Sequence, residues 1–86
     1  MSIRESLRHF LLENYLFTDD ESKLKDSDSF LDNGILDSTG ILDVILFVEE
    51  NHHVKVSEDE MVPDNLDSID ALVAFIERKQ AVNREL

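Results

Sequence analysis

The sequence predicts an all-α fold, a four-helix bundle with a long first loop and a short third helix. Apolar residues recur at helical spacing in separate segments, no alternating strand pattern persists, and only two Gly and one Pro interrupt the 86 residues. A second domain would leave neither half enough chain to bury a core of its own. We therefore expect a single domain over residues 1–86, with a core from about 3 to 79 and a short C-terminal tail at 80–86.

The first helix is expected from about Ile3 to Tyr15. Ser2 and Glu5 have the spacing of a capping box, in which each side chain satisfies a backbone N–H group at the helix start. An apolar stripe at helical spacing predicts the buried face: Ile3, Leu7, Phe10 and Leu11.

The segment from Phe17 to Leu36 lacks helical periodicity. It is rich in Asp, Ser and Asn, which favour turns, so a long loop is expected between the first two helices. A structureless stretch of about 20 residues in a compact domain indicates either a function or a wrong assignment. Apolar residues within it are expected to fasten the loop over the core: Phe17, Leu24, Phe30, Leu31, Ile35 and Leu36.

The second helix is expected to run from Ser38 to about His52. Because successive helical residues turn by about 100°, four of them share one core-facing sector: Ile41, Val44, Ile45 and Val48. Three more apolar residues flank that sector: Leu42, Leu46 and Phe47. Since the helix is apolar around much of its girth, we expect it to lie at the centre of the bundle.

Two further segments predict the remaining helices. Ser57 and Glu60 form a second capping box, which opens a short third helix that Val62–Pro63 ends. Asp67 is expected to cap a last helix that extends to about Lys79. The core stripe of this last helix consists of Ile69, Leu72, Val73 and Ile76.

The composition excludes several classes of function. With 20 Asp and Glu against 8 Lys and Arg, the formal net charge is −12, whereas proteins that bind nucleic acid carry clustered positive charge. The absence of cysteine removes disulfides, thiolate metal ligands and any sulfur nucleophile. No apolar run approaches the roughly 20 residues of a membrane span, and the N-terminus lacks a signal-peptide pattern. We expect a cytoplasmic monomer without membrane insertion.

A candidate site lies where the long loop meets the second helix, in the run Gly34-Ile35-Leu36-Asp37-Ser38-Thr39-Gly40. Capping alone would explain an Asp or Ser at a helix start, since the backbone hydrogen bond is worth about 1 kcal/mol. Alternatively, a phosphate ester on Ser38 would be stabilised by the unpaired amides and the positive dipole end of the helix. Asp37 could then bring a divalent metal ion to the hydroxyl, as phosphoryl transfer commonly requires.

The stretch FLDNGILDSTGILD, from Phe30 to Asp43, resembles the acyl and peptidyl carrier protein family, and the resemblance covers nearly the whole chain. The family implies a four-helix bundle with a modified Ser at the start of its second helix. By this resemblance, Ser38 is esterified by phosphopantetheine from coenzyme A, in a reaction catalysed by a separate phosphopantetheinyl transferase. The arm supplies the thiol that the chain lacks.

The same resemblance implies a function. The chain would be a standalone carrier of acyl or aminoacyl groups, held as thioesters, for fatty acid, polyketide, nonribosomal peptide or related biosynthesis. It would not itself be an enzyme, because an acyl- or aminoacyl-loading ligase and a downstream synthase or transferase would do the chemistry. The Gly-Ile-Leu-Asp-Ser run also resembles standalone carriers of aminoacyl or D-alanyl groups, so the cargo stays open.

The resemblance also implies docking positions on and around the second helix. Many family members have Leu after the modified Ser, whereas this chain has Thr39 and then Gly40. Gly40 costs up to about 1 kcal/mol of helix propensity relative to Ala, and easier access for the transferase is one hypothesis for its presence. The residues expected to contact partner enzymes are Asp37, Thr39, Asp43, Leu46, Glu49 and Glu50.

The sequence leaves an alternative of another class. The chain could be an unmodified acidic adaptor, in which Ser38 is only a cap and the second helix binds a partner protein. A calcium sensor is a third interpretation, suggested by three acidic loop residues, but Phe30 at a ligand position and a missing Gly argue against an EF-hand. The three acidic residues are Asp26, Asp28 and Asp32.

A zinc site is also weakly indicated. His52 and His53 are adjacent, but with only His9 elsewhere and no cysteine they lack a credible ligand set. His52 continues the core stripe of the second helix. We expect it to be a partly buried residue at the helix end.

Overall fold

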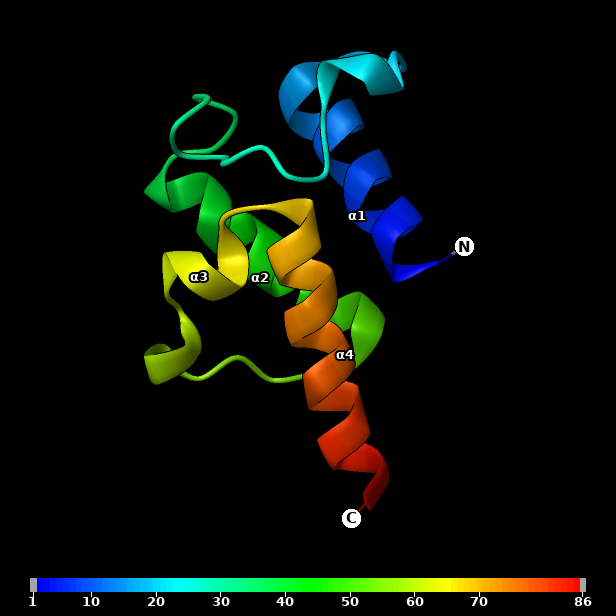
Figure 1. The fold of residues 1–86 in the computed structure, drawn as a ribbon, viewed down its shortest axis with the longest axis vertical. Coiled ribbons are helices and arrows are strands. Elements are labelled where there is room, and N and C mark those ends of the chain that lie inside the picture. Colours follow the sequence, from blue (N-terminus) through cyan, green and yellow to red (C-terminus); the bar gives the residue numbers. More distant parts are fainter. Residues whose placement is uncertain (1, 86) are drawn as a thin grey trace.

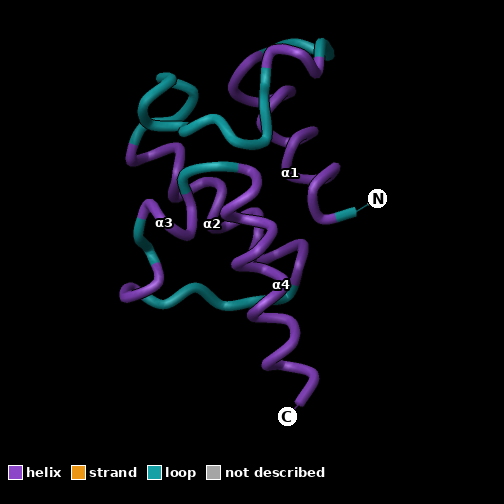
Figure 2. Tube along the Cα trace, in the orientation of Figure 1, coloured by secondary structure: helices purple, strands orange, loops and turns teal. Residues whose placement is uncertain are grey.

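The computed structural model describes residues 2–85, whose path is shown in Figure 1. Within this range the chain forms four α-helices: α1 (Ile3–Leu11), α2 (Ser38–His52), α3 (Pro63–Leu66) and α4 (Ile69–Glu85). The short turns are a π-helical turn, η1 (Leu12–Leu16), and two 3-10 turns, η2 (Glu21–Lys23) and η3 (Glu58–Glu60). No strand occurs among the described residues, and the all-α prediction is confirmed (Figure 2).

The core is formed mainly by the apolar faces of α1, α2 and α4. The predicted stripe of α4 is buried throughout, as are Leu7 and Leu11 of α1. On α2, Val44, Ile45 and Val48 are buried as expected, whereas Ile41 is only partly buried. Ile41 differs because it lines a surface pocket that opens between α2 and α3.

Apolar side chains fasten much of the long loop over this core. Leu24, Phe30 and Leu36 are buried, and Ile35 packs partly buried against the same cluster. These four confirm the expectation that the loop is pinned to the bundle. A long segment that contains only the short turn η2 is thereby held in place before α2.

Two of the predicted loop anchors were wrong. Phe17 is 82% exposed, because the π-turn ends there and the chain turns away with a positive φ of 53°. Leu31 is 45% exposed, because its side chain lines the pocket beside α2 instead of the core.

The third helix differs from the prediction in its position. The capping box of Ser57 and Glu60 is present, but it opens only the 3-10 turn η3. Pro63 was wrongly assigned as the end of a helix, because it is the first residue of α3. At that position the missing N–H is not needed and the fixed φ of proline suits the helix.

The start of α4 was also assigned to the wrong residue. Asp67 lies at the C-terminal end of α3, with φ −91° and ψ 6°, and does not cap α4. The cap is Ser68, whose Oγ accepts a hydrogen bond from the Ala71 amide at 3.0 Å. The carboxylate of Asp67 is therefore available for contacts elsewhere.

α4 extends to Glu85, well beyond the predicted end near Lys79. The segment after Lys79 contains neither Gly nor Pro, so the helix continues through most of the expected tail. Leu86 lies outside the described residues. Among residues 2–85, no helix is long and apolar enough to cross a membrane.

An ion-pair cluster around Asp26 attaches the loop to α1 and α4. Arg8 Nη1 donates to Asp26 Oδ1 at 2.6 Å, and Arg4 Nη1 donates to Oδ2 at 2.7 Å. The amide of Asp70 donates to the Asp26 carbonyl at 3.0 Å. Burial by itself would raise the pKa of Asp26, but the hydrogen bonds from Arg8 and Arg4 outweigh it and lower the pKa.

Candidate functional site

The start of α2 separates the capping residue from the candidate attachment residue. Asp37 is the N-cap, and its Oδ1 accepts a hydrogen bond from the Gly40 amide at 2.8 Å. Ser38 is the first helical residue and is exposed. Among the described residues its hydroxyl has no hydrogen-bond partner. Capping thus explains Asp37 but not Ser38.

The backbone at this helix end favours a negatively charged group attached to the Ser38 oxygen. The first amides of an α-helix have no intrahelical acceptor, and Asp37 satisfies the one at Gly40. The amides of Ser38 and Thr39 precede it, at the positive end of a 15-residue helix. A phosphate ester at Ser38 would be stabilised by this arrangement.

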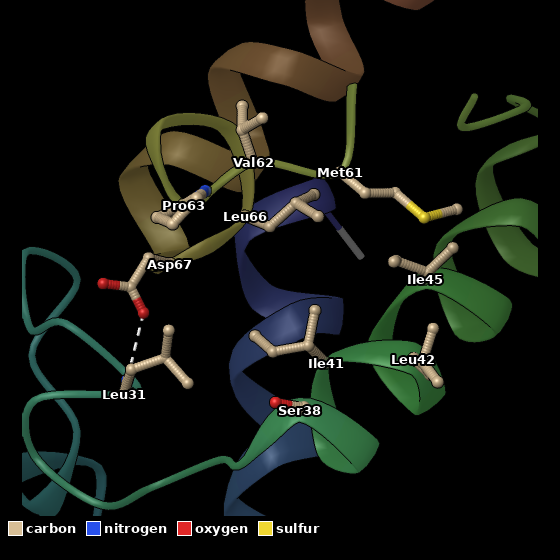
Figure 3. A pocket seen from close by; sticks show the side chains of 10 residues that line it. All are labelled: Leu31, Ser38, Ile41, Leu42, Ile45, Met61, Val62, Pro63, Leu66 and Asp67. Atoms are coloured by element: carbon tan, nitrogen blue, oxygen red, sulfur yellow. Dashed lines mark hydrogen bonds between the residues drawn. The ribbon is translucent and has the colours of Figure 1, made fainter. Parts of the chain in front are cut away.

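An apolar pocket of about 250 Å³ lies beside Ser38, between α2 and the η3–α3 segment. Figure 3 shows the Ser38 side chain at one edge of this pocket and apolar side chains around it. Several of these side chains are substantially exposed, although large and apolar. The lining residues are Leu31, Ser38, Ile41, Leu42, Ile45, Met61, Val62, Pro63, Leu66 and Asp67.

Gly40 is buried, and close packing accounts for its lack of a side chain. A Cβ atom at this position would lie 2.9 Å from Leu36 Cδ2 and 3.3 Å from Tyr15 Cε1. The glycine therefore lets the loop and the π-turn approach the first turn of α2. This packing explains why the residue is glycine, and the hypothesis of easier access for the transferase is not needed.

Tyr15 is a residue of the site that the sequence analysis named only as the end of the first helix. Its hydroxyl donates to Oδ2 of Asp43, five residues after Ser38 on α2, at 2.6 Å. Burial and this hydrogen bond raise the pKa of Tyr15 to about 12, so the phenol stays protonated. No spacing rule would have revealed the pair, because the π-turn decides where Tyr15 points.

Three of the predicted docking residues lie together. Asp43, Leu46 and Glu50 line a groove between α1 and α2, together with Tyr15 and the stacked rings of Phe10 and Phe47. Asp43 and Glu50 are exposed, and Leu46 is 55% exposed. The groove thus combines carboxylates with an accessible apolar side chain.

The other predicted docking residues are placed differently. Thr39 is exposed beside Ser38, and Asp37 is exposed although its carboxylate caps the helix. Glu49 is only partly exposed, and its Oε2 accepts a hydrogen bond from the Val56 amide at 3.0 Å. That carboxylate therefore braces the segment after α2, away from the groove.

The weaker candidate sites are occupied by internal contacts. Both carboxylate oxygens of Asp26 accept from arginines, which opposes a calcium loop there. His52 Nε2 lies 2.9 Å from Ser6 Oγ, and the ring packs edge-on against Phe47. As expected, His52 is partly buried at the end of α2.

Comparisons with known proteins connect this geometry to a family. D-alanyl carrier proteins of Streptococcus pyogenes serotypes M5 and M49 are each 34% identical over 80 residues, which covers 93% of this chain and 98% of theirs. The solution structure of a holo acyl carrier protein from Nitrosomonas europaea superposes with a TM-score of 0.75 at 27% identity. It covers 94% of this chain and 99% of its own. No protein-family model matches the chain.

Proposed function

This chain belongs to the acyl and peptidyl carrier protein family and carries acyl or aminoacyl groups, and on that premise we propose that Ser38 is the residue to which its phosphopantetheine arm is attached. The free, exposed hydroxyl of Ser38 at the first residue of α2 is the observation that supports this assignment. The adaptor alternative is not favoured, because it gives the hydroxyl no role once Asp37 caps the helix.

In the proposed modification, the Ser38 oxygen attacks the phosphorus that joins pantetheine to the rest of coenzyme A. A new O–P bond forms, the bond from phosphorus to the adenosine bisphosphate breaks, and a base of the transferase takes the hydroxyl proton. The first-turn amides of α2 stabilise the phosphodiester charge that results. Ser38 is thus both accessible and electrostatically suited to esterification.

The structure around Ser38 fits a flexible thiol-bearing arm. When bound, the arm supplies a thiol that holds the cargo as a thioester, which is activated for attack and held at high effective concentration near successive enzymes. The apolar pocket beside Ser38 would shelter apolar parts of the arm or cargo. The chain contributes attachment and presentation, and catalysis is left to the transferase, the loading ligase and the downstream synthase or transferase.

D-alanine is the first cargo to test. The curated relatives are named for D-alanine, and their similarity extends over 93% of this chain. We propose that a D-alanine-activating ligase loads the arm in preference to a ligase for long-chain fatty acids. With the first ligase and ATP, the modified protein should gain the mass of one D-alanyl group. With the second ligase and ATP, only a small fraction of the protein should gain the mass of a fatty acyl group. The reverse preference would assign an acyl cargo.

Intact mass after coexpression with a promiscuous phosphopantetheinyl transferase tests the attachment. The wild-type chain should gain the mass of one phosphopantetheine, and Ser38→Ala should gain none. Thr39→Ala is the matched control, because it removes the adjacent hydroxyl but keeps Ser38, and at the end point it should still gain the mass of one phosphopantetheine. An unmodified wild-type chain, or a modified Ser38→Ala variant, would contradict the assignment.

We further propose that the groove with Asp43, Leu46 and Glu50 docks on basic enzyme surfaces. Among the described residues, neither carboxylate forms a salt bridge within the chain, and the strongly negative protein attracts basic partners over some distance. An exposed Leu46 between them supplies apolar contact. Asp37 and Thr39 adjoin Ser38 and extend the same surface, whereas Glu49 contributes through the fold.

Reversing Asp43 and Glu50 to Lys should raise the transferase KM for the carrier by about tenfold at low salt, and by less at high salt. Tyr15→Phe controls for loss of the Tyr15–Asp43 hydrogen bond, and a double reversal of Asp19 and Glu77 controls for net charge. An unchanged KM at low salt, or an equal rise in the charge control, would remove this groove from the docking surface.

A further inference from the structure

Asp67 contacts three consecutive residues of the loop that precedes the attachment site. Its Oδ1 accepts a hydrogen bond from the Leu31 amide at 3.0 Å, and its Oδ2 accepts one from the Ser29 hydroxyl. Its backbone carbonyl accepts from the Phe30 amide at 2.8 Å. Figure 3 shows the carboxylate directed at Leu31, at the side of the pocket that also contains Ser38.

These contacts continue through the loop to the start of α2. The carbonyl of Phe30 accepts from the amides of Ile35 at 2.9 Å and Leu36 at 3.3 Å, which closes the turn formed by residues 30–36. Leu36 is buried against Gly40 in the first turn of α2. Through its carboxylate and its backbone carbonyl, Asp67 at the end of α3 is thereby linked to the residues on either side of Ser38.

We propose that Asp67 is a positioning residue for the modification of Ser38, and this role depends on the attachment proposed above. By holding residues 29–36 against α3, Asp67 keeps Ser38 in the orientation that the transferase accepts. Residues 29–36 belong to no helix, so their order depends on a few such contacts. Asp67 acts at a distance and does not touch the reacting atoms.

The expected kinetic effect follows from the populations of two loop states. Without the carboxylate, the loop exchanges between the closed turn and open conformations in which Ser38 is misplaced. When only a fraction of the carrier is competent, its apparent affinity falls by that fraction, while the chemistry after docking is unchanged. Loss of Asp67 should therefore raise KM and leave kcat nearly constant.

Asp67→Asn separates positioning from charge. The Asn amide oxygen still accepts from the Leu31 amide. The Asn NH₂ group donates to Ser29 Oγ, which already serves as an acceptor for the Asp32 amide at 3.1 Å. Asp64→Ala is the matched charge control, because Asp64 is an exposed acidic residue on the same short helix.

The test measures KM and kcat for modification by a purified phosphopantetheinyl transferase with coenzyme A. Asp67→Ala should raise KM for the carrier about tenfold with kcat within twofold, as a competent fraction of about one tenth predicts. Asp67→Asn and Asp64→Ala should stay within twofold of wild type. Ser29→Ala removes the hydrogen bond from the Ser29 hydroxyl to Asp67 and should raise KM about threefold. If Asp67→Ala does not fold, the KM of Ser29→Ala tests the role of Asp67.

Three outcomes would overturn the role of Asp67. They are a wild-type KM for Asp67→Ala or for Ser29→Ala, an equal KM rise in Asp64→Ala, and an Asp67→Asn variant as impaired as Asp67→Ala. Amide hydrogen exchange provides a second readout, since residues 30–36 should exchange faster in Asp67→Ala but not in Asp64→Ala. If wild type is never modified, the attachment at Ser38 fails, and hydrogen exchange still shows whether Asp67 holds the loop.

Discussion

At the start of α2, neighbouring residues have separate tasks. Asp37 caps the helix, Ser38 presents a free hydroxyl, and Gly40 lets Leu36 and Tyr15 pack against the helix. Because the cap does not use the serine, the hydroxyl can be esterified without loss of the hydrogen bond that starts the helix. The stability of the helix start and the proposed attachment at Ser38 are therefore separable.

Gly40→Ala should destabilise the fold by about 1 kcal/mol, although Ala is the better helix former. The propensity gain is at most about 1 kcal/mol, whereas overpacking a buried site costs about 1–3 kcal/mol. The new Cβ would meet Leu36 Cδ2 at 2.9 Å, and Leu36 is itself buried and not free to move. Urea denaturation measures the change in the free energy of unfolding.

A double-mutant cycle with Leu36→Ala identifies the cause. Once the Leu36 side chain is truncated, the extra Cβ of Gly40→Ala has room, so its cost should fall or change sign. A Gly40→Ala variant that is more stable than wild type would show that helix propensity dominates at this position. The packing explanation would then be wrong.

At the scale of elements, the loop and the turns position the site more than the long helices do. The π-turn η1 carries Tyr15 to Asp43, α3 and the two residues before it form one wall of the pocket, and the turn before α2 is tied to Asp67. π-helical turns and irregular segments commonly occur at functional positions. The far end of α2 is held differently, by His52 against Ser6 of α1.

The contact of α2 with α1 should weaken as the pH falls from 7 to 5. Burial, with a smaller contribution from His53, lowers the pKa of His52 from its ordinary value of 6.5. As the pH falls, His52 is therefore protonated in the unfolded chain at a higher pH than in the folded one. The free energy of unfolding declines below pH 6.5, by less than about 1.4 kcal/mol per pH unit. Ser6 on α1, Phe47 on α2 and Gln80 on α4 face this residue, and none is charged.

His52→Gln should flatten the dependence of the urea midpoint on pH between 7 and 5. His9→Gln, at an exposed histidine of α1 that lies 3.0 Å from Glu13, is the matched control and should not flatten this dependence. Equal slopes for wild type and His52→Gln would show that another group controls stability in this range.

At the scale of the whole molecule, a net charge of −12 opposes the compact state. At 0.01 M salt the Debye length is about 30 Å, comparable to the 39 Å long axis, so like charges repel across the entire protein. At 0.1 M it falls to about 10 Å, and only neighbouring charges still interact. The ion pairs around Asp26 and between Glu60 and Lys79 offset a small part of this repulsion.

Added salt should therefore raise the melting temperature between 0.01 and 0.1 M. A variant with Glu58→Gln and Asp59→Asn, at two exposed acidic positions of η3, should melt higher than wild type at low salt and respond less to added salt. Circular dichroism at increasing potassium chloride measures both effects. A wild-type melting temperature that falls steadily over this range would show that internal ion pairs outweigh the repulsion.

The sequence by itself determined the helical class, the bounds of α2, most of the buried stripes and the position of Ser38 at a helix start. These features follow from local periodicity and from the turn residues before α2, so no knowledge of distant contacts is needed. Capping also has local signals, but they did not decide between Asp37 and Ser38, and they pointed to Asp67 where Ser68 is the cap. Both residues of each pair are chemically able to cap, and the backbone angles that choose between them depend on the surrounding fold.

Only the tertiary structure decided how the site is assembled. It placed Tyr15 on Asp43, Glu49 on Val56 and Asp67 on Leu31 of the loop, and these pairs lie 28, 7 and 36 residues apart in the sequence. It also explained Gly40, whose environment is made by Leu36 and Tyr15 rather than by its own helix. Such contacts carry no periodic signal, because they arise where irregular segments meet a helix, and their geometry is set by the packing of the whole bundle.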